Sequence, residues 1–262
     1  MKTNKFCNIF FSEIFKTKRN VGLIIMLCLP VIVSMYFFIT TWNGFAKISD
    51  SLTIGTYFGE TYTRNHFYLY SFLYPLIVSF AVFSFDNIEY PNDCTRLVFT
   101  LPVKKSKIFL SKVFVLFLYV TCSIVLAYTL FVLSINALSL LFPELCLQSF
   151  EVRDDINILF LRTYVFMIAV MMIQNCLSML FKNFMMPVSF ALFCSIVSII
   201  ASNWKWSFLF PYGGIYKALG WFYQEDLHLF HKEIVASLIY IVIFYAIGFI
   251  VFGNSNRIHK NR

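Results

Sequence analysis

Six long segments of this sequence contain no charged residue, and this feature limits the possible folds more than any other. They are residues 21–42, 67–85, 113–135, 163–181, 184–202 and 234–253. A helix of about 20 apolar residues crosses the ~30 Å hydrocarbon core of a bilayer. A backbone in that core must satisfy its own hydrogen bonds, as a helix does. We therefore predict an all-α integral membrane protein, a single domain of residues 1–262 with six transmembrane helices.

The composition excludes a soluble enzyme. Of the 262 residues, 60% are hydrophobic and 13% are charged, whereas ordinary soluble domains contain about 25% charged residues. The net charge of +8 would suggest a nucleic-acid partner in a soluble protein. Here the positions of the charges account for it better, so we expect no nucleic-acid partner.

The charged residues fall unevenly between the connections, and this orients the chain. If both termini are cytoplasmic, the inner segments are residues 1–20, 86–112, 182–183 and 254–262. They hold fourteen of the 21 Lys and Arg residues and four of the 13 Asp and Glu residues, a net charge of +10, against −2 for the outer segments. Because cytoplasmic connections are enriched in Lys and Arg, the pattern predicts a multi-pass protein with both termini in the cytoplasm.

Residues 4–19 are predicted to form a helix that lies in the membrane interface. Most apolar residues between positions 6 and 15 gather on one half of a helical wheel, and the polar residues take the other half, which is typical of interfacial helices. The basic residues Lys16, Lys18 and Arg19 follow directly and are suited to anionic lipid headgroups.

The segment 86–112, between the second and third spans, is charged and lies between two apolar segments. Pro91 and Pro102 bracket residues 92–101, whose apolar side chains recur with helical spacing. The pattern predicts a short cytoplasmic helix lying flat on the membrane. A solvated loop that only joins two spans is the alternative.

Three further segments are predicted to lie outside. Residues 43–66 and 142–156 are polar and are expected to be outer loops. Residues 204–232 are too polar for a span and unusually aromatic, and amphipathic aromatic rings concentrate at the headgroup level. Within them we predict a helix-turn-helix at 207–223, a re-entrant or interfacial helical hairpin before the sixth span.

Few polar residues lie within the predicted spans. No Asp, Glu, Lys or His lies in mid-span, and Asp86 and Arg162 lie at span ends, where we expect their side chains to reach water. Gln174 and Asn175 are adjacent in the fourth span. They either line a path or join two helices, and joining is the more common role.

Motifs for chemistry are absent. The sequence contains no G-x-x-x-x-G-K-[ST] phosphate loop, so we expect no nucleotide hydrolysis by the chain itself. His228 and His231 lie beside Glu225, Asp226 and Glu233 and could be drawn as a metal site. A polar rim before the sixth span is the simpler interpretation, and we expect neither a metal nor another cofactor.

The order of these features, with the sequence LPVKKSKIFLSK, resembles the type-two permeases of ATP-binding-cassette (ABC) exporters. Such chains show an acidic residue after the second span, a Leu-Pro pair, a basic cluster and a lysine leading into the third span. The matching positions are Glu89, Leu101, Pro102, Lys104, Lys105, Lys107 and Lys112. Lys104 and Lys105 stand where that family often has arginine.

Two further features extend the resemblance. The aromatic, glycine-containing segment FLFPYGGIYKAL at 208–219 is similar to one that such permeases carry ahead of the last span. The length near 250 residues and the opening SEIFKTKRN look most like the bacitracin- and lantibiotic-immunity group.

The resemblance implies a division of labour. A separate ATPase subunit would dock on the matched positions and on Arg96 in the same segment, and a second permease, identical or a sister chain, would complete a path through the membrane of a bacterial cell. The expected path residues are Gln174, Asn175, Pro211, Gly213 and Gly214. The substrate would be a hydrophobic or cationic amphipathic compound, exported in antibiotic resistance or immunity.

Two other function classes remain open. A non-transporting scaffold or sensor would bind a soluble partner through segment 86–112 but would not need Gln174, Asn175 or residues 208–223. A secondary transporter would follow an ion gradient, but such proteins usually need ionisable groups or broken helices near the midplane.

Overall fold

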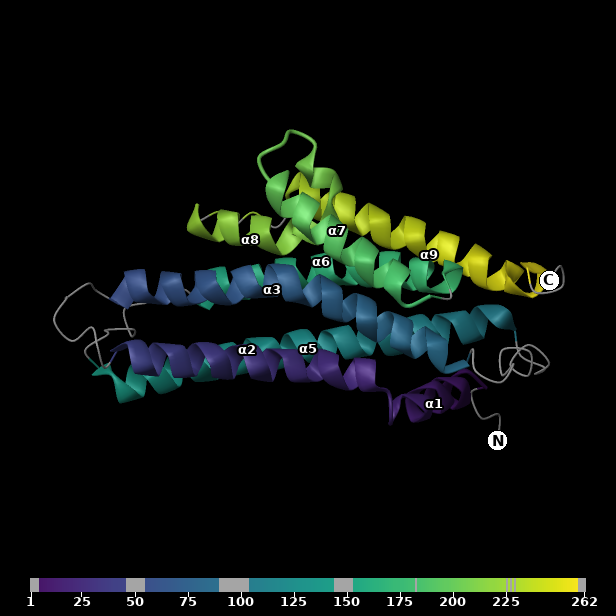
Figure 1. The fold of residues 1–262 in the computed structure, drawn as a ribbon, viewed down its shortest axis with the longest axis horizontal. Helices are drawn as coiled ribbons and strands as arrows, with labels where there is room; N and C mark the ends of the chain where they lie inside the picture. Colours follow the sequence, from purple (N-terminus) through teal and green to yellow (C-terminus); the bar gives the residue numbers. More distant parts are fainter. Residues whose placement is uncertain are drawn as a thin grey trace.

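The fold is built from helices (Figure 1). The computed structural model describes residues 5–45, 55–89, 104–143, 153–181, 183–224, 226, 228 and 230–258. In chain order the elements are α1 (Lys5–Thr17), α2 (Val21–Phe45), α3 (Gly55–Asp86), the 3-10 turn η1 (Asn87–Glu89), α5 (Lys105–Leu141), α6 (Arg153–Leu180), α7 (Met185–Ile200), the 3-10 turns η5 (Ser207–Leu209) and η6 (Pro211–Gly213), α8 (Gly214–Tyr223) and α9 (Lys232–Ile258). The prediction of an all-helical chain is confirmed for these residues.

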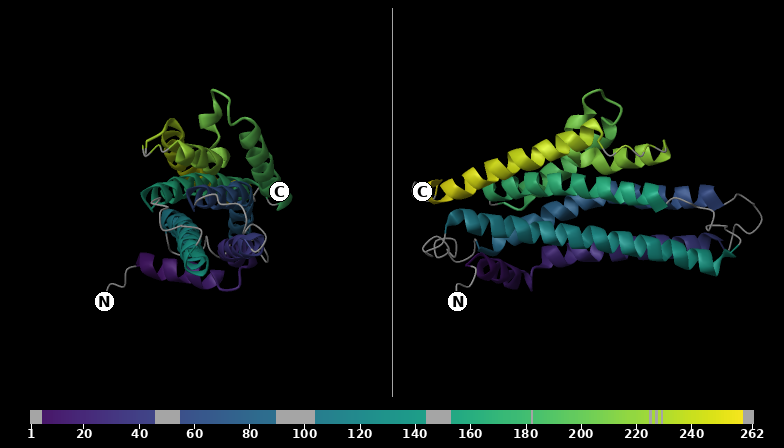
Figure 2. Two further views of the ribbon diagram at one scale, coloured as in Figure 1. Left: turned by 90° about the vertical axis from the view of Figure 1, so that its left-hand side faces the viewer. Right: turned by 180° about the vertical axis from the view of Figure 1, so that it is seen from behind.

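The helices pack in three layers along one long axis. α2 and α5 form one outer layer, α3 and α6 form the middle layer, and α7, α8 and α9 form the other outer layer (Figures 1 and 2). The middle layer contacts both others, since α3 packs on α2 and α7 while α6 packs on α5 and α9. α3 and α6 are therefore the centre of the bundle.

One end of the bundle carries most of the described basic residues, and we call it the basic end. The turn between α1 and α2, the last turn of α3 and the first turn of α5 all lie there (Figure 1). Lys16, Arg19, Lys104 and Lys107 are exposed at this end. It corresponds to the side that the charge distribution predicts to be cytoplasmic.

Five helices are long and apolar enough to cross a membrane within the described residues: Val21–Asn43, Gly59–Asp86, Lys105–Leu141, Asp155–Leu180 and Lys232–Gly253. The expected fifth span, 184–202, corresponds to α7, which has 16 residues. At 1.5 Å per residue α7 is about 24 Å long, shorter than the ~30 Å hydrocarbon core. A multi-pass membrane protein is thus supported, and the fifth expected span, with it the total of six, stays a prediction.

Several helices extend beyond the spans expected from hydropathy. α3 begins at Gly55, so the second half of the expected outer loop 43–66 is helical. α5 begins at Lys105 and ends at Leu141, well outside the expected span 113–135. Polar residues can continue a helix past the hydrocarbon core, because a helix satisfies its backbone hydrogen bonds in either environment.

The expected helix-turn-helix at 207–223 is wrong in detail. The structure has two 3-10 turns, η5 and η6, followed by the single helix α8. α8 runs roughly along the long axis of the bundle (Figure 1) and packs on α6 and α3.

The N-terminal helix has the geometry expected of an interfacial helix. α1 lies across the long axis of the bundle, as the end-on view in Figure 2 shows. Its inner face packs on α5, where the rings of Phe10 and Phe114 meet edge to face at 5.4 Å, and the Thr17 and Tyr119 hydroxyls share a hydrogen bond of 2.8 Å. Phe11 and Phe15 remain exposed on its other side.

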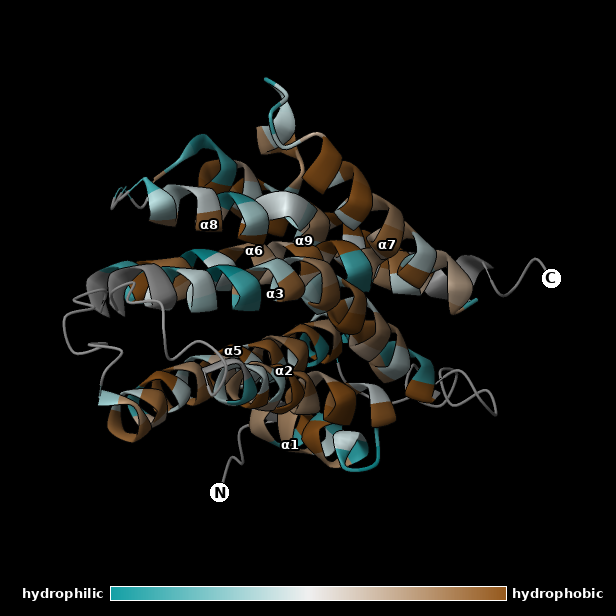
Figure 3. Ribbon diagram, turned by 60° about the vertical axis from the view of Figure 1, so that its left-hand side comes forward, coloured by the Kyte–Doolittle hydropathy of each residue, from teal (hydrophilic) through white to brown (hydrophobic). Residues whose placement is uncertain are grey.

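Much of the surface of the bundle is apolar. Figure 3 shows hydrophobic residues along most of α2, α5, α7 and α9. On α7 and α9 large exposed side chains include Phe190, Phe193, Ile239, Val242 and Ile250. A water-soluble protein rarely exposes contiguous apolar surface of this kind, so these faces are suited to lipid or to another membrane helix.

Two glycines allow the closest helix contacts. A Cβ atom added to Gly22 in α2 would lie 2.6 Å from Cβ of Ser84 in α3, and one added to Gly214 would lie 2.1 Å from the ring of Phe166 in α6. α8 therefore begins against α6 at a distance that no larger residue permits.

The first prediction compares two glycines of α8. Gly214→Ala should destabilise the protein by about 1–3 kcal/mol, because the new methyl group overlaps the Phe166 ring. Gly220→Ala meets no atom within 4 Å and should stabilise the helix by roughly 0.5–1 kcal/mol. Thermal unfolding of the two purified variants in one detergent checks this, and equal midpoints would contradict the packing described.

Candidate functional site

A buried chain of hydrogen bonds joins the middle layer to η6. The Ser79 hydroxyl of α3 donates to Oε1 of Gln174 in α6 at 2.9 Å. Nε2 of Gln174 donates to the Tyr212 hydroxyl in η6 at 2.7 Å. Ser79 and Gln174 are fully buried and Tyr212 nearly so. Gln174 thus joins helices, which is one of the two roles expected for it.

The expected path residues of η6 and α8 lie in the same buried region. Pro211, Gly213 and Gly214 are buried. A Cβ on Gly213 would lie 2.7 Å from Cβ of Ser198 in α7. Within this chain these residues are packing positions, and their role in a translocation path stays a prediction.

Asn175 lies on the part of α6 that approaches Asp86, the last residue of α3. The Asn175 carbonyl accepts a hydrogen bond from the Ser178 hydroxyl at 3.0 Å, and the same hydroxyl donates to Oδ2 of Asp86. Asp86 is 4% exposed. The expectation that its side chain reaches water is wrong, because α6 covers the end of α3.

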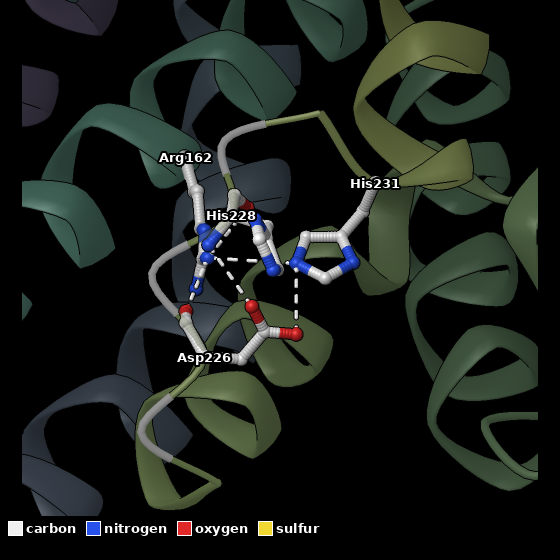
Figure 4. Close-up of polar contacts among 4 residues, drawn as sticks. All are labelled: Arg162, Asp226, His228 and His231. Atoms are coloured by element: carbon white, nitrogen blue, oxygen red, sulfur yellow. Dashed lines mark hydrogen bonds and ion pairs between the residues drawn. The ribbon is translucent and has the colours of Figure 1, made fainter.

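A second polar cluster lies towards the opposite end of the bundle, around Arg162 of α6 (Figure 4). One guanidinium nitrogen, Nη2, donates to the backbone carbonyls of Asp226 at 2.5 Å and His228 at 2.8 Å. Arg162 is 2% exposed, so the expectation that it reaches water is also wrong. The segment between α8 and α9 covers it.

Rings and a carboxylate complete the Arg162 cluster. The guanidinium carbon lies 5.1 Å from the centre of the Trp221 ring. The His231 ring stacks on Trp221 with the ring centres 4.0 Å apart and 10° between the planes. Nε2 of His231 is 3.4 Å from Oδ2 of Asp226. The backbone N–H of His228 donates to Oδ1 of Asp226 at 2.9 Å and lowers the pKa of this carboxyl.

No metal site is formed by the described residues: no group of three His, Cys, Asp or Glu side chains among them could hold an ion. His228, His231 and Asp226 instead surround Arg162 (Figure 4). Glu225 lies outside the described residues. Glu233 pairs at 3.0 Å with Lys217 of α8, which also donates to the Ser207 hydroxyl at 2.6 Å.

The residues expected to couple to an ATPase separate into two groups. Lys104 and Lys107 are exposed at the start of α5. Nζ of Lys105 donates to the carbonyl of Gly253 in α9 at 3.3 Å, and Lys112 is 5% exposed with Nζ 5.9 Å from the Phe252 ring. Two of the four lysines therefore hold α5 to α9.

The remaining coupling positions are Glu89, Arg96, Leu101 and Pro102. Arg96, Leu101 and Pro102, with the whole helix expected at 92–101, lie outside the described residues. Glu89 ends η1.

His66 is a buried residue that the sequence did not single out. It was expected in an outer loop, but it is fully buried in α3. The rings of Phe37, Tyr62 and Phe131 surround it with centroids at 4.4, 4.5 and 5.3 Å. A signal existed in the sequence, since helical periodicity continues from the second span back through Tyr62.

The second prediction concerns the Ser79–Gln174–Tyr212 chain. Gln174→Ala leaves two buried hydroxyls without partners and should destabilise the protein, at about 1–3 kcal/mol for each unsatisfied group. Tyr212→Phe removes only one hydroxyl and should cost less. A double-mutant cycle on thermal stability should give a coupling of about 0.5–3 kcal/mol, and strictly additive effects would contradict the contact.

The third prediction concerns Arg162. Arg162→Lys retains the charge but not the planar group that reaches two carbonyls and lies over Trp221, so the free energy of unfolding should fall by about 1.5–3 kcal/mol. Arg64 of α3 is exposed, so Arg64→Lys should change it by less than about 0.5 kcal/mol. Denaturation of both variants in detergent provides the comparison, and similar losses would refute a special role for Arg162.

Comparison with known proteins adds one match. The family model described as "ABC-2 family transporter protein" matches residues 9–198. This range includes Ser79 and Gln174, the lysines at the start of α5 and most of α7, and it stops before η5 and Tyr212. No curated protein and no solved structure matches the chain.

Proposed function

The chain belongs to the ABC-2 family of transporter proteins, and we propose that it exports a hydrophobic or cationic amphipathic compound from a bacterial plasma membrane. As a member of this family it is a membrane-spanning permease subunit of an ABC transporter. It is a transport subunit and not itself an enzyme, and ATP hydrolysis is the work of a partner. The substrate class, the direction of transport and the identity of the partner are the proposed parts.

The exposed lysines at the basic end support the proposal that an ATPase subunit binds there. Lys104 and Lys107 lie at the first turn of α5, directly after the segment 90–103. The chain lacks a phosphate loop, so a force generated elsewhere must reach its helices. We assign this contact to Lys104, Lys107 and the preceding Glu89, Arg96, Leu101 and Pro102. Lys105 and Lys112 would then pass the movement to α9, which they contact.

The apolar faces of the outer layers support the proposed substrate class. α2 exposes Val31, Ile32 and Tyr36, and α7 exposes Phe193 and Ile200. A compound dissolved in the bilayer would meet apolar and aromatic surface with few fixed hydrogen-bond partners, which favours breadth of recognition over precision. Antimicrobial peptides and hydrophobic antibiotics fit this description, as in resistance or lantibiotic immunity.

A second permease is part of the proposal. The residues expected in a path, Gln174, Asn175, Pro211, Gly213 and Gly214, are buried within one chain. A translocation path past these residues could form in two ways. Either η6 and α6 separate, or a second permease, identical or a sister chain, packs against them and encloses the path with them. We propose that the Gln174–Tyr212 contact is the one that opens and closes as the transporter cycles.

The fourth prediction tests the coupling surface. The double variant Lys104→Glu and Lys107→Glu should lose most of the ATPase subunit that co-purifies with the tagged chain from its native membrane, because like charges placed at an interface repel the partner. Lys205→Glu with Lys232→Glu makes the same charge change at exposed positions away from the basic end and should retain it. The measurement is the amount of co-purified ATPase per chain, with its ATPase activity.

Two outcomes would contradict the proposal. If no ATPase accompanies the unmodified chain, the partner assignment fails. If an ATPase accompanies all three proteins in equal amount, the partner exists but Lys104 and Lys107 do not bind it. Export is tested separately, by resistance of cells to cationic amphipathic peptides with and without the chain.

A further inference from the structure

A hollow of about 460 Å³ lies at the basic end, where α1 turns into α2. Its walls come from this turn, the last turns of α3, η1 and the start of α7. The lining residues are Lys16, Arg19, Asn20, Val21, Phe80, Phe83, Ser84, Asn87, Ile88 and Phe184. The volume is within the ~300–1,000 Å³ range of small-molecule sites.

Asn20, one of the lining residues, is held by three side-chain hydrogen bonds. Its Nδ2 donates to the carbonyl of Ser84 at 2.9 Å, and its Oδ1 accepts from the Ser84 hydroxyl at 2.9 Å and from the backbone N–H of Leu23 at 3.1 Å. Asn20 therefore caps the start of α2 and joins it to α3.

The charge at the hollow is positive. Nζ of Lys16 lies 2.7 Å from Oε1 of Glu13, which is itself buried. Arg19 is exposed, and within the described part of the chain no carboxylate pairs with it. None of the described lining residues is acidic. The guanidinium of Arg19 is thus available to an anion.

The opposite wall is aromatic. The Phe184 ring meets the Phe80 ring at 5.4 Å and 84° and the Phe83 ring at 5.6 Å and 65°. Phe184 is 41% exposed, so part of its ring faces out of the bundle. A ligand here would need one anionic part and one apolar part.

The position of the hollow relative to the membrane favours a lipid as its ligand. α1 lies across the bundle axis (Figure 2), as a helix in the headgroup region does, and the hollow lies where α1 meets the start of α2, whose apolar residues then enter the hydrocarbon core. Phosphates and the first methylene groups of lipids occupy this depth.

We propose that the hollow is a binding site for an anionic phospholipid, with the phosphate at Arg19 and an acyl chain along Phe80, Phe83 and Phe184. This goes beyond the transport of a substrate, since the lipid stays bound and joins α1, α3 and α7. The shared chemistry is a phosphoryl group, which a free phosphate also offers, and the apolar wall favours the lipid.

The test measures binding of fluorescently labelled phosphatidylglycerol to the purified full-length chain in neutral detergent. One saturable site per chain is expected, and unlabelled phosphatidylglycerol should compete while phosphatidylcholine and inorganic phosphate should not. Arg19→Gln should weaken binding about fivefold, the effect of one cation near a lipid headgroup. The assay needs neither ATP nor a partner, so its result is independent of the proposed export.

The chain offers a control residue close in sequence to Arg19 and another close to Phe184. Lys18 is not among the lining residues, and its Nζ lies 5.9 Å from the Phe15 ring, so Lys18→Gln should leave the saturable binding within about twofold, a small fraction of one charge contact. Phe184→Ala should weaken binding, whereas Phe181→Ala, at a comparable 39% exposure, should not. Both phenylalanines are partly exposed, so the fold should tolerate these changes.

Three results would overturn the proposal. Equal losses for Arg19→Gln and Lys18→Gln would show a general attraction to anionic lipid. Competition by inorganic phosphate with no effect of Phe184→Ala would assign the hollow to a free anion. Absence of saturable binding would leave no site.

Discussion

A buried side-chain amide inside an apolar bundle requires hydrogen-bond partners, and this requirement fixes how several helices of this protein meet. In water such a group costs little, but in a dry interior an unpaired amide or hydroxyl is strongly unfavourable. Gln174 satisfies both ends of its amide by contacts to α3 and η6. Asn20 does the same between α2 and α3. Apolar contacts alone would allow the helices to slide, whereas these contacts specify one register.

The same requirement explains what the sequence could predict and what it could not. Hydropathy located the apolar helices well, because each span is a local property of about 20 residues. It placed the ends of α3 and α5 poorly, because hydropathy does not mark where a helix continues past the hydrocarbon core. Residues 92–101, expected to form the coupling helix, lie outside the described part of the chain.

Burial of charged residues was the least predictable property. Arg162 and Asp86 each lie near a span end, where exposure is the usual outcome. Arg162 is covered by a segment more than sixty positions later in the chain, and Asp86 by α6. The candidate site shows the same limit: Lys104, Lys105 and Lys107 look alike in sequence, and only packing against Gly253 sets Lys105 apart.

The two shortest contacts of Arg162 with the segment before α9 are made to backbone carbonyls. Main-chain oxygens are present whatever residue occupies positions 226 and 228, so the identity of those residues can drift while the arginine keeps its partners. Related chains should therefore conserve the arginine and the length of this segment more than its sequence. Correlated substitutions between α6 and this segment in related sequences would therefore reveal little of the contact, although it holds the two together.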